Sequence, residues 1–227
     1  TVRRFSRLLM QQAQLERERT NLSRYFSPNV VEELSRNDEP LKLIRSQDIA
    51  VMFVDIVGFT AYAANRPAEQ VIETLRGFHA RMEREVFKHG GTLDKYLGDG
   101  LMATFGTPTA GGRDASNALA CARSMVQMME AWNAERESAG DVPIRASIGL
   151  HHGTVVLGDI GANRLEFAVI GNSVNTASRI ESLTRVLDVK IATSDSLIVQ
   201  AKKEAADGED PTAGLTFLGL QPIRGLD

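Results

Sequence analysis

The sequence predicts an α/β (α+β) fold, a mixed β-sheet with helices packed on it. Three observations lead to this prediction. Apolar runs without alternation, such as residues 49–54, are typical of strands buried on both faces. Stretches with apolar residues at helical spacing, such as 67–89 and 113–136, alternate with these runs. A glycine turn at 98–100 predicts a hairpin within the series, which favours a mixed sheet over a purely parallel one.

The composition is that of an ordinary globular protein. The chain has 227 residues, 43% of them hydrophobic and 24% charged, with a formal net charge of −3. This balance does not predict a nucleic-acid or anionic-membrane surface, so no nucleic-acid partner is expected. The single cysteine, Cys121, excludes an internal disulfide and fits a reducing, cytoplasmic compartment. No apolar run approaches the ~18 residues that span a bilayer, and no signal peptide is visible.

We interpret residues 1–40 as a lead-in to a domain at 41–227. Leucines recur every seven residues through 8–22, which fits either a short coiled coil or an exposed helix with one apolar stripe. Ser27 and Pro28 then predict the start of a short helix. The chain does not begin with methionine, so we interpret it as a piece of a longer protein.

The first half of the domain predicts a strand, a helix, a hairpin and a second helix. The apolar run ending at Asp55 is a buried strand. Pro67 begins a helix that keeps the 3.6-residue apolar period up to Gly90 and Gly91. The hairpin strands and the second amphipathic helix are expected at 93–97, 101–105 and 113–136.

The second half predicts strands around one further helix. The letters GNS at 171–173 begin this helix, which we expect to run to about Val186. A polar stretch at 204–214 predicts a loop. Strands are expected from apolar and β-branched content at 143–151, 154–158, 165–170, 189–194, 215–218 and 221–225.

Two aspartates follow predicted strands. Asp55 ends the buried strand and precedes Gly58, where a close turn lets the amides of Gly58, Phe59 and Thr60 face a phosphate. Taken alone, Asp55 is equally explained as a helix cap, and Asp99 as ordinary turn chemistry. Two carboxylates on neighbouring strand ends, however, repel each other unless a cation lies between them. Carboxylates together with substrate phosphates are the usual ligands of Mg²⁺ in proteins.

The segment FAVIGNSVNTASRIE at 167–181 adds complementary chemistry. Asn175 and Arg179 are four residues apart, on one face of the predicted helix. An amide and a guanidinium aimed at the same place suit a phosphoryl group that gains charge in a transition state. The alternative is an exposed helix on which Arg179 pairs with Glu181 or with solvent. The sequence contains no P-loop, HExxH, CxxC or GxSxG motif.

Four segments resemble the catalytic domain of the class III nucleotide cyclases, most closely that of bacterial adenylyl cyclases. The family's order and spacing are kept, and the resemblance runs from about residue 24 to the C-terminus. The segments are FVDIVGFT (53–60), DKYLGDGLMATFG (94–106), IGLHHGTVVLGDIG (148–161) and VIGNSVNTASRIE (169–181). The resemblance implies a ferredoxin-like βαββαβ core. It also implies conversion of ATP to 3′,5′-cyclic AMP and pyrophosphate, by attack of the ribose 3′-hydroxyl on the α-phosphorus.

The resemblance also implies a metal site. Asp55 and Asp99, helped by the backbone carbonyl of Ile56, would hold two divalent cations, Mg²⁺ or Mn²⁺. One ion would lower the pKa of the attacking hydroxyl, and the other would hold the triphosphate. The apolar strand would thus position a carboxylate whose charge the metals neutralise.

Five further residues match positions that contact the substrate in the family. Lys95 matches the adenine-selecting lysine, Asn175 the ribose-orienting asparagine and Arg179 the transition-state arginine. Arg224 stands where the family often has a triphosphate-binding lysine, which keeps the charge but changes its geometry. Ala168 replaces the aspartate that accepts from the adenine amino group in many adenylyl cyclases. Lys95 therefore favours ATP, while Ala168 predicts a less strict purine selection, and a guanylyl or mixed-specificity cyclase is the alternative.

The family forms head-to-tail homodimers with active sites at the interface. One subunit would supply the metal-binding residues, and the other the lysine, the asparagine and the arginine. We expect a cytoplasmic catalytic domain that acts in signal transduction, coupled to an upstream sensor or membrane anchor in the parent protein. The alternative from another class is a catalytically silent nucleotide-binding or dimerisation domain. Such a domain should have lost a metal aspartate or the arginine, and this sequence retains both.

Overall fold

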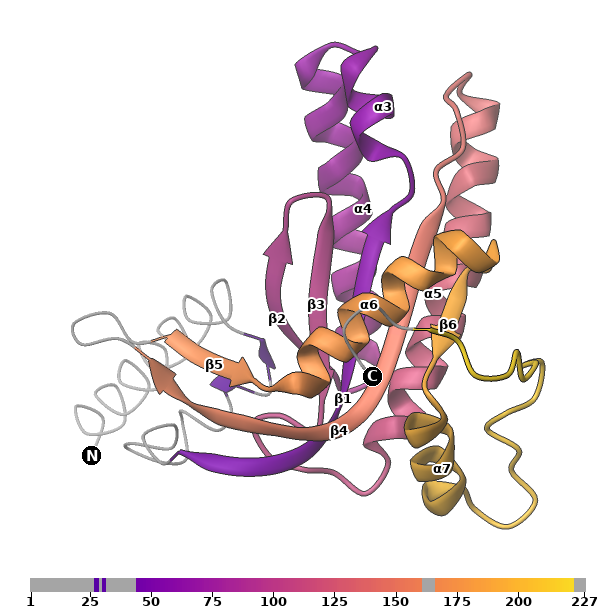
Figure 1. Cartoon of the computed structure of the whole chain (residues 1–227). Helices are drawn as coiled ribbons and strands as arrows, with labels where there is room; N and C mark the ends of the chain where they lie inside the picture. Colours follow the sequence, from indigo (N-terminus) through magenta and orange to yellow (C-terminus); the bar gives the residue numbers. More distant parts are fainter. Residues whose placement is uncertain (1–26, 29, 32–43, 161–165, 223–227) are drawn as a thin grey trace, which may run out of the picture.

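The computed structural model describes residues 27–28, 30–31, 44–160 and 166–222. Expectations for the first 26 residues, for 32–43 and for Arg224 lie outside these ranges. The elements follow one another along the chain as labelled in Figure 1: β1 (Arg45–Ile56), α3 (Phe59–Ala64), α4 (Ala68–Lys88), β2 (Thr92–Leu97), β3 (Gly100–Phe105), α5 (Asp114–Ser138), β4 (Ala146–Ile160), β5 (Glu166–Ile170), α6 (Asn172–Leu187), β6 (Ile191–Thr193) and α7 (Asp195–Glu204).

The strands form one mixed, six-stranded sheet in the order β2-β3-β1-β4-β5, with β6 beside β4. All pairs along this path are antiparallel, and β6 is parallel to β4. With α4 between β1 and β2, and α5 between β3 and β4, the first four strands make the βαββαβ pattern of a ferredoxin-like core. The predicted fold class is therefore confirmed.

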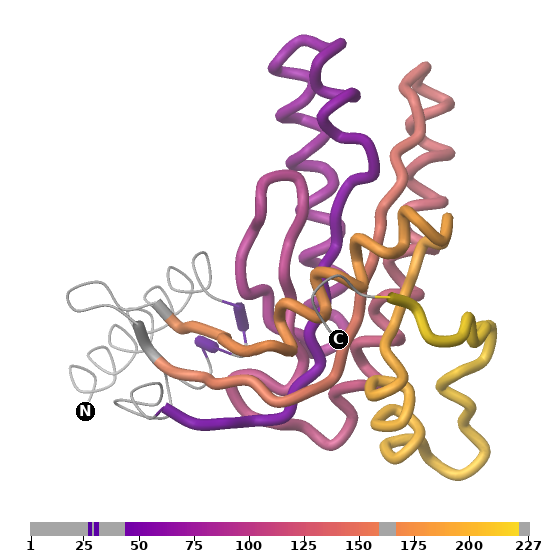
Figure 2. Tube along the Cα trace, in the orientation of Figure 1, coloured from indigo at the N-terminus to yellow at the C-terminus, as the bar shows by residue number. Residues whose placement is uncertain are grey.

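The central strand β1 separates two hydrophobic clusters, because its side chains alternate between the two faces of the sheet. Even-numbered residues from Ala50 to Ile56 pack in the cluster that includes α4, α5 and α7. The odd-numbered residues pack in the second cluster, towards α6. They are Ile49, Val51 and the partly buried Phe53. Figures 1 and 2 show α6 crossing one face of the sheet, with α4 and α5 on the other. Asp55 has an odd number and so lies on the α6 face.

Helix α6 lies close to β4 because two glycines of β4 face it. A Cβ at Gly149 would lie 2.1 Å from the backbone nitrogen of Glu181, and one at Gly153 would lie 2.6 Å from Ser173 Oγ. Ser173 Oγ also donates a hydrogen bond of 2.8 Å to the carbonyl of Thr154. These contacts fix the position of α6, and therefore of every side chain that it carries.

Replacing Gly149 with alanine is expected to lower the free energy of unfolding. Overpacking typically costs about 1–3 kcal/mol, and we expect the upper end because the added methyl group would meet backbone atoms. Urea denaturation measures the change. Gly112→Ala is the matched control, because a Cβ there has no neighbour within 4 Å. Equal stability of the two variants would contradict the close approach of α6.

The lead-in is described at only four positions. Residues 28, 30 and 31 are helical, as predicted. The carbonyl of Ser27 accepts from the amides of Val30 and Val31, which are both buried. Ser27 Oγ donates to the carbonyl of Leu93 at 2.9 Å, so this side chain ties the lead-in to the sheet.

Two predicted boundaries are wrong. β4 is one continuous strand from Ala146 to Ile160, where the sequence predicts two, because β1 pairs with it along the whole length of β1 and keeps Gly153 in register. β6 covers only Ile191–Thr193 and is half-buried, where the sequence predicts a longer buried strand.

Two helices and one irregular segment also differ from the sequence-based prediction. The sequence does not predict α3 or α7, although Ser194 signals the start of α7 by accepting from the amide of Leu197 at 3.3 Å. The predicted strand at 215–218 is wrong: residues 215–222 have no strand partner within the described ranges. Phe217 is 82% exposed there. No helix in the described ranges is both long and apolar enough to cross a bilayer.

Candidate active site

The structure brings Asp55 and Asp99 together at one end of the sheet. Asp55 is the penultimate residue of β1, and Asp99 lies in the turn between β2 and β3. Val54 is paired with Leu101, so this turn lies beside Asp55. Glycine is needed at position 100 for this approach, since a Cβ on Gly100 would lie 2.6 Å from the oxygen of Val54 and 2.9 Å from Asp55 Oδ1.

The carboxylate of Asp55 is electrostatically unfavourable where it lies. Its pKa is raised from 3.8 to about 6, first by burial and then by the negative charges of Asp99 and Glu181 and a hydrogen bond to Asp99. Arg185 acts in the opposite direction. A cation between the two aspartates would relieve this cost.

The donor set fits a hard divalent cation. Two carboxylates supply the oxygen ligands that Mg²⁺ prefers, and the remaining positions are usually filled by water or substrate phosphates. In the part of the chain that the structure describes, no group of three or more His, Cys, Asp or Glu side chains is placed to hold a metal. The pair at Asp55 and Asp99 therefore needs further oxygen atoms, from a backbone carbonyl, water or a substrate.

The alternative of a helix cap does not account for Asp55. Helix α3 begins after Gly58, which has no side chain, and no side-chain hydrogen bond caps the helix. Gly58 has a φ of +75°, a left-handed conformation that favours glycine. Phe59 and Thr60 follow as the first residues of α3, and the first amides of a helix have no acceptor within it. These amides are available to an anion at this end of the sheet.

The turn that carries Asp99 is held against α4. The rings of His79 on α4 and Tyr96 on β2 stack with their centroids 4.4 Å apart. The Tyr96 hydroxyl donates to Glu83 Oε2 at 2.7 Å. Burial is the main reason why the pKa of His79 is lowered, so the ring is expected to be neutral near pH 7.

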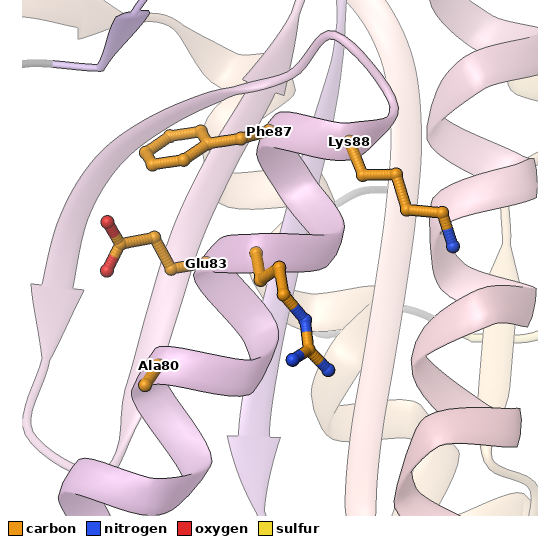
Figure 3. Close-up of a pocket in the computed structure, with 5 residues that line it drawn as sticks. Ala80, Glu83, Phe87 and Lys88 are labelled. Carbon is orange, nitrogen blue, oxygen red and sulfur yellow. The ribbon is translucent and has the colours of Figure 1, made fainter.

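A hollow of about 560 Å³ lies on the outer surface of α4 and contains none of the candidate residues. Figure 3 shows its five lining side chains on successive turns of this helix: Ala80, Glu83, Arg84, Phe87 and Lys88. All of them come from a single helix. The hollow is therefore a feature of the helix surface, separate from the two aspartates.

Asn175 and Arg179 lie on α6, as predicted. They make no hydrogen bond or ion pair with either aspartate among the described residues. Glu181 follows Arg179 by about 200° around the helix axis, so the two side chains face different directions. Glu181 forms two contacts with Arg185, of 2.8 Å and 3.2 Å, so the alternative in which it pairs with Arg179 is wrong.

Three residues around Asp55 are absent from the sequence-based site: Ser147, Glu181 and Arg185. Arg185 Nη1 lies 3.3 Å from Asp55 Oδ2. Ser147 Oγ donates to Glu181 Oε1 and lies 3.3 Å from the backbone oxygen of Asp55. The spacing of Glu181 and Arg185 is typical of a helical ion pair, which is the signal available in the sequence. This spacing does not reveal which strand the ion pair of Glu181 and Arg185 faces.

Lys95 lies on the same face of the sheet as Asp55. It is paired with Met102, which is paired in turn with Phe53 of β1, and paired residues point to the same face. The ammonium lies 3.4 Å from Asp94 Oδ2, and the Lys95 side chain is 42% exposed. The Lys95 side chain is therefore accessible to a substrate on this face.

Ala168 lies on β5, opposite Gly158 of β4. It is 5% exposed, so its small side chain is buried. The next residue, Val169, packs in the cluster beneath α6. Because side chains alternate along a strand, Ala168 lies on the other face of this strand pair, and a single chain does not bring it to the face of Lys95.

Comparisons with known proteins bear on the family and the fold of this chain. The family model described as the adenylate and guanylate cyclase catalytic domain matches residues 41–211. Adenylate cyclase 1 of Rhizobium meliloti (strain 1021) is 32% identical over 157 residues, which cover 69% of this chain and 24% of that relative. The matched stretch makes up between 24% and 38% of the length of the curated relatives.

Two solved structures have a similar fold. The adenylyl cyclase CyaB from P. aeruginosa gives a TM-score of 0.65 at 29% identity, covering 71% of this chain and 83% of that one. The guanylyl cyclase Cya2 gives a TM-score of 0.63 at 31% identity, covering 69% and 79%. One is an adenylyl and the other a guanylyl cyclase, so overall similarity does not choose between the two purines.

Proposed function

The chain belongs to the adenylate and guanylate cyclase catalytic-domain family, and from this premise we propose that it converts ATP to 3′,5′-cyclic AMP and pyrophosphate. A bond forms between the ribose 3′-oxygen and the α-phosphorus. The bond from the α-phosphorus to the bridging oxygen of the leaving pyrophosphate breaks, and the hydroxyl proton is released. The observation that carries this proposal is the juxtaposition of Asp55 and Asp99. Burial, and after it the negative charge of Asp99, raises the pKa of Asp55 to about 6.

Asp55 and Asp99 are proposed to hold two divalent cations, Mg²⁺ or Mn²⁺, with the backbone carbonyl of Ile56. When bound, such ions lower the pKa of a coordinated hydroxyl and neutralise phosphate charge. The amides that open α3, at Gly58, Phe59 and Thr60, are proposed to donate hydrogen bonds to the triphosphate. Arg224 is proposed to add a further positive charge there.

The contacts of the α6 side chains support active sites shared between two copies of the chain. Arg185 contacts its own Asp55 and pairs with Glu181, whereas no hydrogen bond or ion pair joins Asn175 or Arg179 to either aspartate among the described residues. We therefore propose that Asn175 and Arg179 act on a substrate bound at the aspartates of a partner subunit. There Asn175 orients the ribose, and Arg179 stabilises charge that develops on the transferred phosphoryl group. A two-fold dimer would have two such sites.

Purine selection is proposed to depend mainly on Lys95. An ammonium group donates hydrogen bonds, so Lys95 can pair with the acceptor nitrogens of adenine. A carboxylate at this position could not donate to them. Ala168 contributes no side-chain acceptor, and this favours a mixed-specificity or guanylyl cyclase as the second candidate. We further propose that a sensor or membrane region of a longer parent protein regulates the domain. The curated relatives are longer than the stretch that matches this chain, which leaves room for such a region in them.

The direct test is to incubate the purified chain with Mn²⁺ and either ATP or GTP and to identify the product by mass spectrometry. We expect cyclic AMP from ATP, and a smaller yield of cyclic GMP from GTP. Cyclic GMP as the main product would support the second candidate. No cyclic product from either nucleotide, in a protein that is folded and dimeric, would support the catalytically silent domain instead.

Lys95→Glu is expected to reduce kcat/KM for ATP by about 10- to 100-fold, because a donor facing the purine becomes an acceptor of opposite charge. Steady-state kinetics with both nucleotides measure the change. Lys190→Glu is the matched control, since Lys190 is 57% exposed and pairs with Glu130 on the surface. An unchanged rate with ATP in Lys95→Glu would refute the role of Lys95 in purine selection.

A further inference from the structure

Among the described residues, Arg185 is the cation that contacts Asp55. Its Nη1 atom lies 3.3 Å from Asp55 Oδ2, while the Oδ1 atom of the same carboxylate faces the turn at Gly100. The proposed metal ions and the guanidinium therefore require the same carboxylate. A positive charge at this distance also disfavours the arrival of a second cation.

The guanidinium of Arg185 has a second, buried anchor. Nη1 and Nη2 lie 2.8 Å and 3.2 Å from the two carboxylate oxygens of Glu181, a two-pronged contact. The Glu181 side chain is 8% exposed, and Ser147 donates a hydrogen bond to it. Arg185 can therefore move away from Asp55 by a small displacement and remain paired with Glu181. Its release from Asp55 leaves neither Arg185 nor the buried Glu181 carboxylate without a partner of opposite charge.

We propose that Arg185 is an internal counter-ion of Asp55, which a divalent cation displaces onto Glu181 when it binds. This inference rests on the proposed metal site. If Arg185 has this role, the divalent cation and the nucleotide are expected to bind cooperatively. Without nucleotide, Arg185 competes with the metal and keeps its affinity low. The phosphates of a bound nucleotide add negative charge, so metal and nucleotide bind more favourably together than the metal does alone.

The test measures Mn²⁺ binding without nucleotide, by electron paramagnetic resonance of free Mn²⁺ at constant ionic strength. Arg185→Gln removes the charge but keeps a hydrogen-bond donor, and it should bind Mn²⁺ roughly three- to tenfold more tightly than wild type. Arg185→Lys keeps the charge and should stay close to wild type. Arg145→Gln is the matched control: this arginine is 57% exposed, pairs with Asp188 at 2.9 Å, and its removal changes the net charge equally.

Unchanged or weaker Mn²⁺ binding by a folded Arg185→Gln protein would overturn the inference. Tighter binding by Arg145→Gln to the same extent would also overturn it, because the effect would then be one of net charge. Asp55→Asn separates this failure from that of the proposed metal site. If the wild-type protein binds Mn²⁺ no more tightly than the Asp55→Asn variant, both the proposed metal site and the counter-ion role of Arg185 are wrong.

A second measurement needs no variant at Arg185. In a crystal structure of the wild-type protein with Mn²⁺ and a non-reactive ATP analogue, the Arg185 guanidinium should be paired with Glu181 only. Metal bound to Asp55, with Arg185 still within ion-pair distance of Asp55 Oδ2, would overturn the displacement.

Discussion

Asp55→Asn and Asp99→Asn proteins are expected to lose at least about 10²-fold of cyclase activity while remaining folded and dimeric, because each change removes a metal ligand rather than core packing. Asp55 is about one-third exposed, and asparagine matches its shape. The loss should appear in kcat with both Mg²⁺ and Mn²⁺. Near-normal turnover by either variant would rule out the two-aspartate site.

Stability separates this loss of function from misfolding. The pKa of Asp55 is raised to about 6 in the folded chain, so its charged form is less favourable there than in the unfolded chain. The stability contributed by this carboxyl is therefore present at low pH and is lost as the pH rises from about 4 to about 6. At pH 7.5 and without metal, Asp55→Asn should unfold at no lower a temperature than wild type.

Asp188→Asn is the matched control for both measurements. Asp188 is 83% exposed and pairs with Arg145 on the surface. Its backbone has a φ of 50°, a conformation that asparagine tolerates well. We expect activity close to wild type from this variant. If it lost as much activity as Asp55→Asn, a general effect of charge would explain both.

The sequence predicts the core because its signals are local and agree with one another. The buried run of β1, the apolar period of α4 and the Gly-Asp-Gly turn each indicate one element. Their order along the chain then matches the order of a ferredoxin-like sheet. The proximity of Asp55 and Asp99 follows from the same reasoning, since both come at strand ends. Gly100 allows the turn that carries Asp99 to approach Asp55, because a side chain at position 100 would collide with Val54 and Asp55.

The sequence does not predict the surroundings of Asp55, because they depend on how α6 is placed over the sheet. Glu181 and Arg185 have helical spacing, but their contact with Asp55 and Ser147 depends on the glycines of β4. The continuity of β4 has a similar cause. Pairing with β1 overrides the local preference of glycine for a break, and such long-range pairing leaves no mark in a short window of sequence.

The second large effect concerns the sharing of sites between subunits. Asp55→Ala and Arg179→Ala proteins are each expected to be inactive alone. When they are mixed and allowed to exchange subunits, activity should return to about a quarter of the wild-type value. In a mixed dimer, one site combines both defects. The other takes its aspartate from the Arg179→Ala chain and its arginine from the Asp55→Ala chain, so it is intact.

The expected quarter follows from counting sites. Random pairing makes about half of the dimers mixed, and each mixed dimer has one working site out of two. Subunit exchange is monitored separately, by fluorescence energy transfer between labelled chains. The contacts of the α6 side chains lead us to expect recovery, because Arg185 contacts its own Asp55, whereas Arg179 makes no such contact among the described residues. Demonstrated exchange without recovered activity would mean that each site is built from a single chain, and Arg179 would then have to reach the aspartates of its own subunit by a movement of α6.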